Sequence, residues 1–160
     1  MSARPAFAIE VVVGDQLDRV VISGIIDENA DLAPLAALGV RPIEVSMRGV
    51  RRINSFGVRS WIDAVRKIPA TTQLTFLQCP PPVVDQCNMV AGFLGHGVLA
   101  SFLAPMICAE CDEQIDQLFE TAICRANGGK LPTTKCPRCG RPMEVDDLEE
   151  QYLLFVRETR

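Results

Sequence analysis

Residues 49–61, GVRRINSFGVRSW, change within a few positions from a charged turn to a segment with regularly spaced apolar side chains. Before them, residues 42–47 alternate apolar and polar side chains, which is typical of a half-buried strand. After Ser55, apolar side chains recur every three or four positions, which predicts an amphipathic helix that ends at Pro69. The apolar side of this helix comprises Val58, Trp61, Ile62, Val65 and Ile68. The stretch therefore predicts a strand, a turn and a helix.

The segments on either side extend this unit into an α/β domain. Residues 7–24 contain two apolar runs separated by a Gly-Asp-Gln turn, which predicts a β-hairpin. A short helix is expected within residues 27–38, with Asn29 or Asp31 as its cap. Further predicted elements are a strand at residues 73–78, a helix at residues 81–95 and a strand at residues 98–104. This order predicts a mixed β-sheet with helices packed on it.

Two CxxC pairs mark a second unit, Cys108 with Cys111 and Cys136 with Cys139, and 24 residues separate the pairs. Two such pairs can direct four thiolates toward one point and complete the tetrahedral sulfur shell that Zn²⁺ accepts. Because all four positions are cysteines, no coordination position remains for water, so the predicted zinc is structural. We expect residues 1–106 to form the α/β domain and residues 107–160 to form a zinc ribbon with a C-terminal helix, a unit too small to be stable by its hydrophobic core alone.

Inside the zinc unit, residues 113–131 predict a strand, a glycine turn and a return strand. Residues 146–156 predict a short helix, with Leu148, Tyr152 and Phe155 or Val156 as its apolar side. Cys124 has two interpretations, a small buried apolar residue or a regulatory thiol. A redox dithiol pair in place of a metal site is one alternative for the CxxC pairs. Another is a zinc-thiolate redox sensor, in which oxidation of the cysteines ejects zinc and releases the acidic C-terminal helix from the first domain.

The turn at residues 51–57 precedes a helix N-terminus, where free backbone amides are either capped by a side chain or bind an anion. Asn54 or Ser55 can supply the cap. The element order, together with RRINSFGVRSWIDAV at residues 51–65, resembles a STAS domain, the fold of the anti-sigma-factor antagonists. The resemblance covers about residues 5–105 and leaves out the zinc unit.

The resemblance implies a degenerate phosphorylation motif. The family has Asp-Ser-Ser-Gly at this turn, and a partner kinase phosphorylates the serine directly before the glycine. These positions correspond to Asn54, Ser55, Phe56 and Gly57, so phenylalanine replaces the phosphoacceptor. Ser55 remains a candidate phosphosite, and the capping role is the competing interpretation. The resemblance also implies a protein partner, such as an anti-sigma kinase of the GHKL type or a larger signalling complex.

Charge around the motif indicates where such a partner would bind. Residues 41–67 hold seven Lys/Arg and two Asp/Glu, a local charge of +5 in a chain with a net charge of -4. One interpretation is a solvated helix face, and the other is a docking surface that combines arginines with an exposed aromatic ring. The predicted docking surface comprises Arg51, Arg52, Asn54, Ser55, Phe56, Gly57 and Arg59.

Several other classes of function are disfavoured. His96 is the one histidine, and the chain has no nucleotide-binding loop and no HExxH motif, so we expect no catalysis. The acidic charge of residues 106–160 argues against nucleic-acid binding. Residues 88–109 carry no formal charge, but glycines and Pro105 interrupt them, so we expect no membrane span. No signal-peptide pattern opens the chain, which favours the cytoplasm. The expected function is non-catalytic signalling. The sequence indicates no particular oligomeric state.

Overall fold

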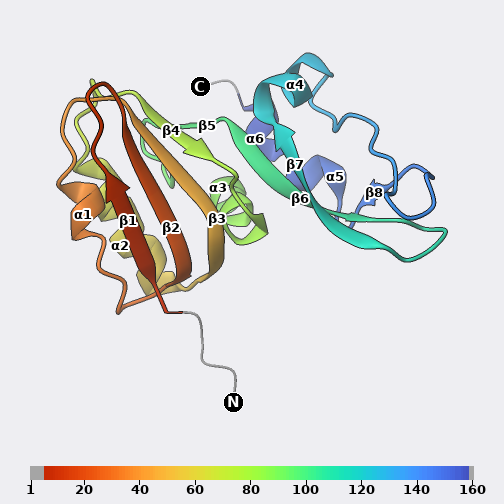
Figure 1. The fold of residues 1–160 in the computed structure, drawn as a ribbon, viewed down its shortest axis with the longest axis horizontal. Coiled ribbons are helices and arrows are strands. Elements are labelled where there is room, and N and C mark those ends of the chain that lie inside the picture. The colour runs from red at the N-terminus through yellow and green to blue at the C-terminus, as the bar shows by residue number, and fades with distance from the viewer. Residues whose placement is uncertain (1–5, 159–160) are drawn as a thin grey trace.

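A five-stranded mixed sheet forms the first half of the molecule (Figure 1). The computed structural model describes residues 6–158. The strands are β1 (Ala8–Val12), β2 (Asp18–Ile26), β3 (Ile43–Ile53), β4 (Leu74–Leu77) and β5 (Val98–Leu99), and they lie in that order. β1 is antiparallel to β2, and the other neighbours are parallel. The predicted hairpin and the predicted mixed sheet are therefore confirmed.

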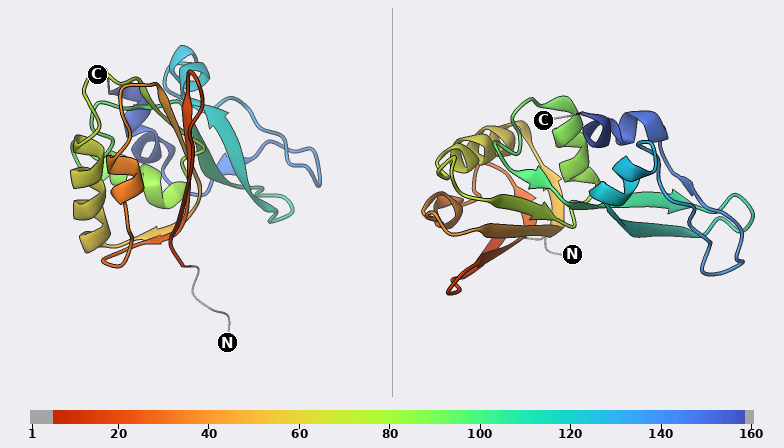
Figure 2. Two further views of the ribbon diagram at one scale, coloured as in Figure 1. Left: turned by 60° about the vertical axis from the view of Figure 1, so that its left-hand side comes forward. Right: turned by 90° about the horizontal axis from the view of Figure 1, so that it is seen from above.

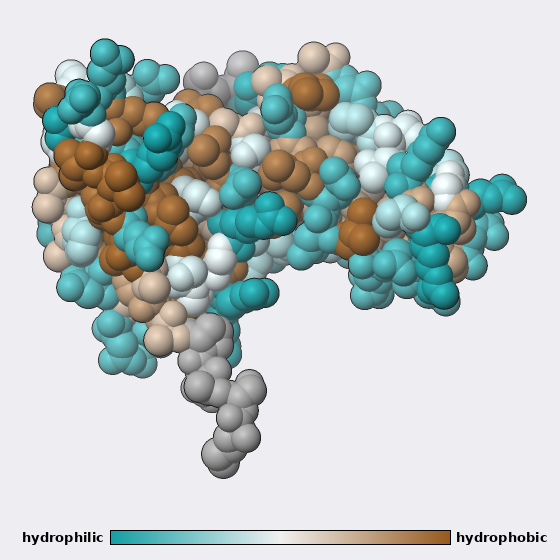
Figure 3. All heavy atoms as spheres, viewed as in Figure 1, coloured by the Kyte–Doolittle hydropathy of each residue, from teal (hydrophilic) through white to brown (hydrophobic). Residues whose placement is uncertain are grey.

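Three helices connect these strands: α1 (Ala33–Ala36), α2 (Ser55–Arg66) and α3 (Pro81–Met89). Seen from above, α2 and α3 lie on one side of the strands, and the helices near the C-terminus lie on the same side (Figure 2, right). Among residues 6–158, no helix covers the opposite face of the first sheet, and apolar residues gather on it (Figure 3). Burial alternates along β2: Val20 and Ile22 are buried, whereas Val21 between them is 47% exposed.

The core of this half centres on Trp61, which is fully buried. Its indole Nε1 donates a hydrogen bond of 2.8 Å to the carbonyl of Phe93, and its ring stacks against the Phe93 ring with centroids 5.8 Å apart. Ala64 and Val65 are also buried on α2, so the predicted amphipathic helix is confirmed. The hydrogen bond satisfies the indole N–H in a place that water does not reach.

The prediction that the third helix continues to Gly95 is wrong. α3 ends at Met89, and Val90 has extended backbone angles of φ -116° and ψ 111°. Gly92 follows with φ +76°, a left-handed conformation that glycine adopts without a steric penalty. The chain therefore turns here, which places Phe93 against Trp61 rather than on a continued helix.

A second, three-stranded sheet follows directly. It comprises β6 (Ser101–Ile107), β7 (Gln114–Glu120) and β8 (Glu144–Val145), in the order β7-β6-β8, with both pairs antiparallel. The prediction of one strand at residues 98–104 is wrong, because the chain leaves the first sheet after Leu99 and enters the second at Ser101. Ala100 connects both: its N–H donates to Phe76 O, and its carbonyl accepts from Thr121 N. The second sheet thus begins before residue 107. The predicted boundary between an α/β domain of residues 1–106 and a zinc unit of residues 107–160 stays a prediction.

The predicted return strand within residues 113–131 is also wrong. β7 is followed by α4 (Thr121–Ala126), and Gly128 and Gly129, with φ of +71° and +78°, end the helical segment. The N–H of Gly129 donates to the carbonyl of Cys124, which completes the C-terminal turn of α4. Cys124 is fully buried in this helix.

Two short helices near the C-terminus, α5 (Glu149–Tyr152) and α6 (Leu154–Arg157), pack the second sheet against α3. Tyr152 and Val156 are buried, as predicted, whereas Leu148 is 64% exposed. The side chain of Asn88 on α3 donates to the carbonyls of Gln151 and Tyr152 and accepts from the N–H of Phe155. Buried side chains of both halves also belong to one continuous hydrophobic cluster.

The uncharged residues 88–109 are divided between the end of α3, β5 and β6. Within residues 6–158, no helix has both the length and the apolar character needed to cross a bilayer.

Candidate metal centre and docking surface

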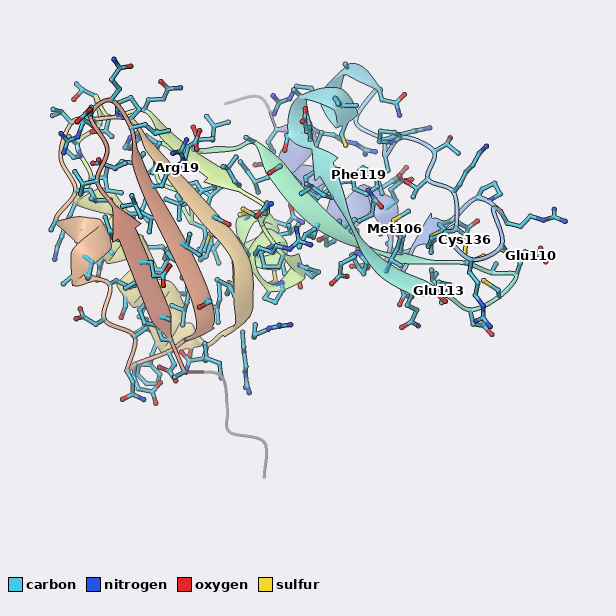
Figure 4. All side chains as sticks on the ribbon, in the orientation of Figure 1. Arg19, Met106, Glu110, Glu113, Phe119 and Cys136 are labelled. Atoms are coloured by element: carbon cyan, nitrogen blue, oxygen red, sulfur yellow. The ribbon has the colours of Figure 1, made fainter. Side chains whose placement is uncertain are left out.

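The four predicted zinc ligands come together at the outer end of the second sheet, where Cys136, Glu110 and Glu113 are labelled in Figure 4. The Sγ atoms of Cys108, Cys111, Cys136 and Cys139 all lie within 4.8 Å of one another. Cys108 and Cys136 are buried, Cys111 is half-buried and Cys139 is exposed. The four cysteines are therefore positioned to bind one metal ion.

Each CxxC pair lies in the same type of backbone turn. In the first, the N–H of Asp112 donates to Cys108 O, and the N–H of Cys108 donates to Glu113 O, both at 2.9 Å. In the second, the N–H of Gly140 donates to Cys136 O at 2.9 Å, and the N–H of Cys136 donates to Arg141 O at 2.7 Å. The residue after the second cysteine is left-handed in both turns, with φ +58° at Asp112 and +74° at Gly140. Two equivalent turns thus present two thiols each toward the same point.

The spacing of the sulfurs fits a tetrahedral metal. The Sγ atoms of Cys108 and Cys139 are 3.5 Å apart, and those of Cys111 and Cys136 are 3.6 Å apart. A tetrahedron with metal–sulfur bonds of about 2.3 Å has edges of about 3.8 Å. The observed separations are close to this edge, so a metal ion fits between the four thiolates with little movement of the two turns.

Electrostatics also favour a cation at this point. Desolvation raises the pKa of Cys136, but the backbone N–H groups of Cys139 and Arg138 and the neighbouring thiols lower it to about 7. The backbone N–H of Glu113 lowers the pKa of Cys111, but desolvation and the three other thiols outweigh it and raise that pKa to about 12. Four thiolates this close repel one another, and a divalent cation removes the conflict because it binds all four in the ionised form.

An ion pair joins the two turns outside the sulfur cluster. Arg138 Nη1 lies 3.8 Å from Glu113 Oε2; the arginine is exposed and the glutamate is half-buried. Such a pair contributes little to stability. Neither these two residues nor Asp112 were among the predicted site residues. The position of Asp112 after a CxxC pair, like that of Gly140, was the available signal for its left-handed turn.

Asn54 caps the helix that follows the motif. Its Oδ1 accepts a hydrogen bond of 2.8 Å from the N–H of Gly57, and its Nδ2 donates to Glu28 Oε2 at 2.9 Å. Ser55 is the first residue of α2 and is exposed, so of the two predicted caps Asn54 is correct and Ser55 is wrong. A cap residue directly precedes the first helical residue, and Ser55 is that first helical residue.

Gly57 is required by packing rather than by an unusual backbone angle. A Cβ atom at this position would overlap the carbonyl oxygen of Ile26 at the end of β2. Phe56, in contrast, is 61% exposed, and Arg51, Arg52 and Arg59 are exposed around the same strand-to-helix junction. The aromatic ring thus takes part in none of the core packing that fixes the turn.

The cationic residues of residues 41–67 do not form one patch. Arg41 lies at the opposite end of the sheet, where its Nε is 3.3 Å from the buried carboxylate of Asp18. Near Asn54, a hollow of about 580 Å³ is lined by acidic residues as well as by Arg52: Asp27, Glu28 and Asp31. The hydrogen bond from Asn54 lowers the pKa of Glu28. The predicted docking surface is therefore chemically mixed, which a count of charges along residues 41–67 does not reveal.

A comparison with models of known protein families finds no match for this chain, and a comparison with curated proteins finds no significant match.

Proposed function

We propose that this chain is a non-catalytic signalling protein whose first half binds a protein partner through the docking surface around Phe56. The observation that carries the proposal is the exposure of Phe56, 61%, at a helix N-terminus where Asn54 already caps the N–H of Gly57. Large aromatic side chains flanked by arginines are enriched at protein interfaces.

The likeness to STAS domains supports a signalling role. The order of elements from β1 to β5, the antiparallel first pair and the helix that begins directly after the motif agree with the resemblance in the sequence. In this proposal the partner is an anti-sigma kinase of the GHKL type or a larger signalling complex in the cytoplasm. Phe56 replaces the phosphoacceptor, so binding does not depend on phosphorylation at that position.

We propose that the metal is Zn²⁺ and that its role is structural. A closed shell of four cysteine thiolates with tetrahedral spacing is typical of structural zinc sites and leaves no position for a substrate. Elemental analysis of protein purified without added metal tests this assignment. About one zinc per chain is expected, and iron in its place would contradict it.

Affinity capture from the native cell lysate tests the docking surface. Phe56→Asp and Arg52→Glu should each remove the same partner, identified by mass spectrometry, because they change the ring and the charge that the partner contacts. Arg66→Glu is a matched control, because Arg66 is exposed in the last turn of the same helix. If Phe56→Asp and Arg52→Glu retain every partner that the wild type captures, the docking surface is wrong.

A zinc-thiolate redox sensor is the second candidate function. The observation that favours it is the exposure of Cys139. The chain continues from this cysteine directly into β8 and then α5, so a change at Cys139 would act on both elements. Hydrogen peroxide would oxidise two thiolates to a disulfide. The two electrons would cleave the O–O bond of the peroxide, which takes up two protons and leaves as two water molecules, and the zinc would be released. Zinc release under mild peroxide, followed by loss of a captured partner, would support this function. Retention of zinc and of the partner would remove it.

A further inference from the structure

A cavity of about 430 Å³ lies where the two halves of the molecule meet. Its walls come from four parts of the chain: helix α3, the segment that leads into and through β5, helix α4, and helix α6 with the residue after it. This volume is within the range of small-molecule sites, which commonly form at such junctions. Neither half forms the cavity alone, so it is a property of the assembled fold.

The inner wall is apolar. Leu94 and Leu99 are 4% and 6% exposed, and Phe155 is half-buried beside them. Leu94 and Leu99 come from the first half, and Phe155 comes from α6. An apolar chain or ring of a ligand would cover these surfaces and exclude water from them.

A buried hydroxyl in the same wall has no partner. Thr121 is 4% exposed, and its Oγ1 has no hydrogen-bond partner among the residues that the structure describes. Buried polar side-chain atoms are normally satisfied, so one without a partner needs an explanation. Threonine in a helix has two favourable χ1 positions, and rotation between them can present the hydroxyl to a ligand oxygen.

The rim carries one cation and one anion that do not pair with each other. Arg125 donates from Nε to the carbonyl of Val156 at 3.2 Å, which anchors its guanidinium group beside α6. Glu158 lines the same cavity, but within residues 6–158 no carboxylate lies within ion-pair distance of Arg125. The remaining N–H groups of Arg125 match the geometry of a carboxylate. With Glu158 nearby, the rim has no net charge, which favours a monoanion over a phosphate dianion.

We propose that this cavity binds a small apolar monocarboxylate, whose carboxylate pairs with Arg125 and whose chain covers Leu94, Leu99 and Phe155. The hydroxyl of Thr121 donates to a carboxylate oxygen. The site is distinct from the docking surface around Phe56 and from the metal centre, so it does not depend on the function proposed above.

Titration of the zinc-loaded full chain, followed by ¹H–¹⁵N NMR, tests the proposal. Hexanoate is the probe, and hexan-1-ol and hexylammonium are controls of the same length without the negative charge. Hexanoate should shift the amide signals of Leu99, Thr121 and Phe155 in a saturable way, whereas the two controls should bind at least about tenfold more weakly because they cannot pair with Arg125. No saturable shift, shifts confined to other residues, or equal binding of hexylammonium would overturn the proposal.

Two variants separate binding from folding. Arg125→Gln should weaken hexanoate binding about tenfold, and Arg66→Gln, a change at an exposed arginine of α2, should leave it unchanged. Thr121→Val removes the hydroxyl with little change of shape. It should leave the melting temperature of the free protein equal or higher while weakening hexanoate binding several-fold. If both Arg125→Gln and Thr121→Val bind hexanoate as tightly as the wild type, the assigned contacts are wrong.

Discussion

The two sheets of the molecule are held together differently. The first encloses Trp61, and its core includes fully buried side chains from three central strands, such as Ile22, Val45 and Phe76. The second has a strand of only two residues, β8, and helices of four to six residues. The four cysteines at its outer end are positioned to bind one metal ion, and α3 of the first half supports its inner end. A small unit can therefore be stabilised by a metal at one end and by a neighbour's core at the other.

Removal of the metal should have the largest effect, and it should destabilise the second sheet far more than the first. Cys136→Ser, or a zinc chelator, should unfold the outer part of the second sheet, because binding of structural zinc contributes on the order of 10 kcal/mol in small zinc domains. Hydrogen exchange measured by mass spectrometry should show loss of protection in β6 and β7 and retained protection in β2 and β3. Lys135→Ala, next to Cys136 and exposed, is the control. Equal loss of protection in both sheets would show that the first half also depends on the metal.

Trp61→Phe should have the opposite effect: it should destabilise the first half and leave the metal centre intact. The change removes the hydrogen bond to Phe93 O and leaves a cavity in the first core, so the free energy of unfolding should fall by about 2–4 kcal/mol. Urea unfolding followed by circular dichroism measures this loss, and zinc content should remain at the wild-type level. A variant that also loses its zinc would show that the two stabilising centres are coupled.

Asn88→Ala tests the contact between the halves. Asn88 makes three hydrogen bonds to α5 and α6, two as donor and one as acceptor, and its loss leaves backbone groups without partners. The free energy of unfolding should fall by about 1–3 kcal/mol. Differential scanning calorimetry should then show a broadened or divided transition, because the second sheet loses its support on α3. Asn29→Ala, at an exposed position of the β2–α1 loop, should leave a single transition.

The sequence was most informative where the signal is local. The helix with Trp61, Ala64 and Val65 buried on one side was recognisable from spacing alone, and so were the four metal ligands, because each CxxC pair carries its own turn. Errors arose where a distant partner decides the structure. Residues 98–104 have strand character throughout, but pairing with β4 holds Val98 and Leu99 in one sheet, and pairing with β7 holds Ser101 and the residues after it in another.

The proposed docking surface shows the same limit. A helix cap was expected at Asn54 or Ser55, and only the backbone geometry at the start of α2 decides between them. Glu28, the partner of Asn54, lies 26 residues away, and no pattern in the sequence connects the two. For the same reason, the sequence could not show that Arg41 pairs with Asp18, away from the other arginines of residues 41–67.

A comparison of Asn54→Ala with Ser55→Ala sharpens the distinction between a cap and the first helical residue. Asn54→Ala removes the acceptor of the Gly57 N–H and should lower the free energy of unfolding by about 1 kcal/mol. Ser55→Ala should change it by less than about 0.5 kcal/mol, because the exposed Ser55 side chain makes no hydrogen bond among the described residues. Thermal unfolding of the two variants measures both values. Equal losses would contradict the assignment of Asn54 as the cap.

The smallest effect concerns the hydrogen bond between Asn54 and the exposed Glu28. The bond from Asn54 lowers the pKa of Glu28 below its ordinary value, because it favours the ionised carboxylate. A lowered pKa in the folded state means that this contribution to stability is present above the ordinary glutamate pKa and is lost as the pH falls through the lowered value. An NMR titration of the Glu28 side chain should show its pKa rising toward the ordinary value in Asn54→Ala and staying low in Ser55→Ala. If the pKa of Glu28 is the same in both variants, Asn54 does not join the β2–α1 loop to the start of α2, and the acidic residues beside the docking surface are held there by other contacts.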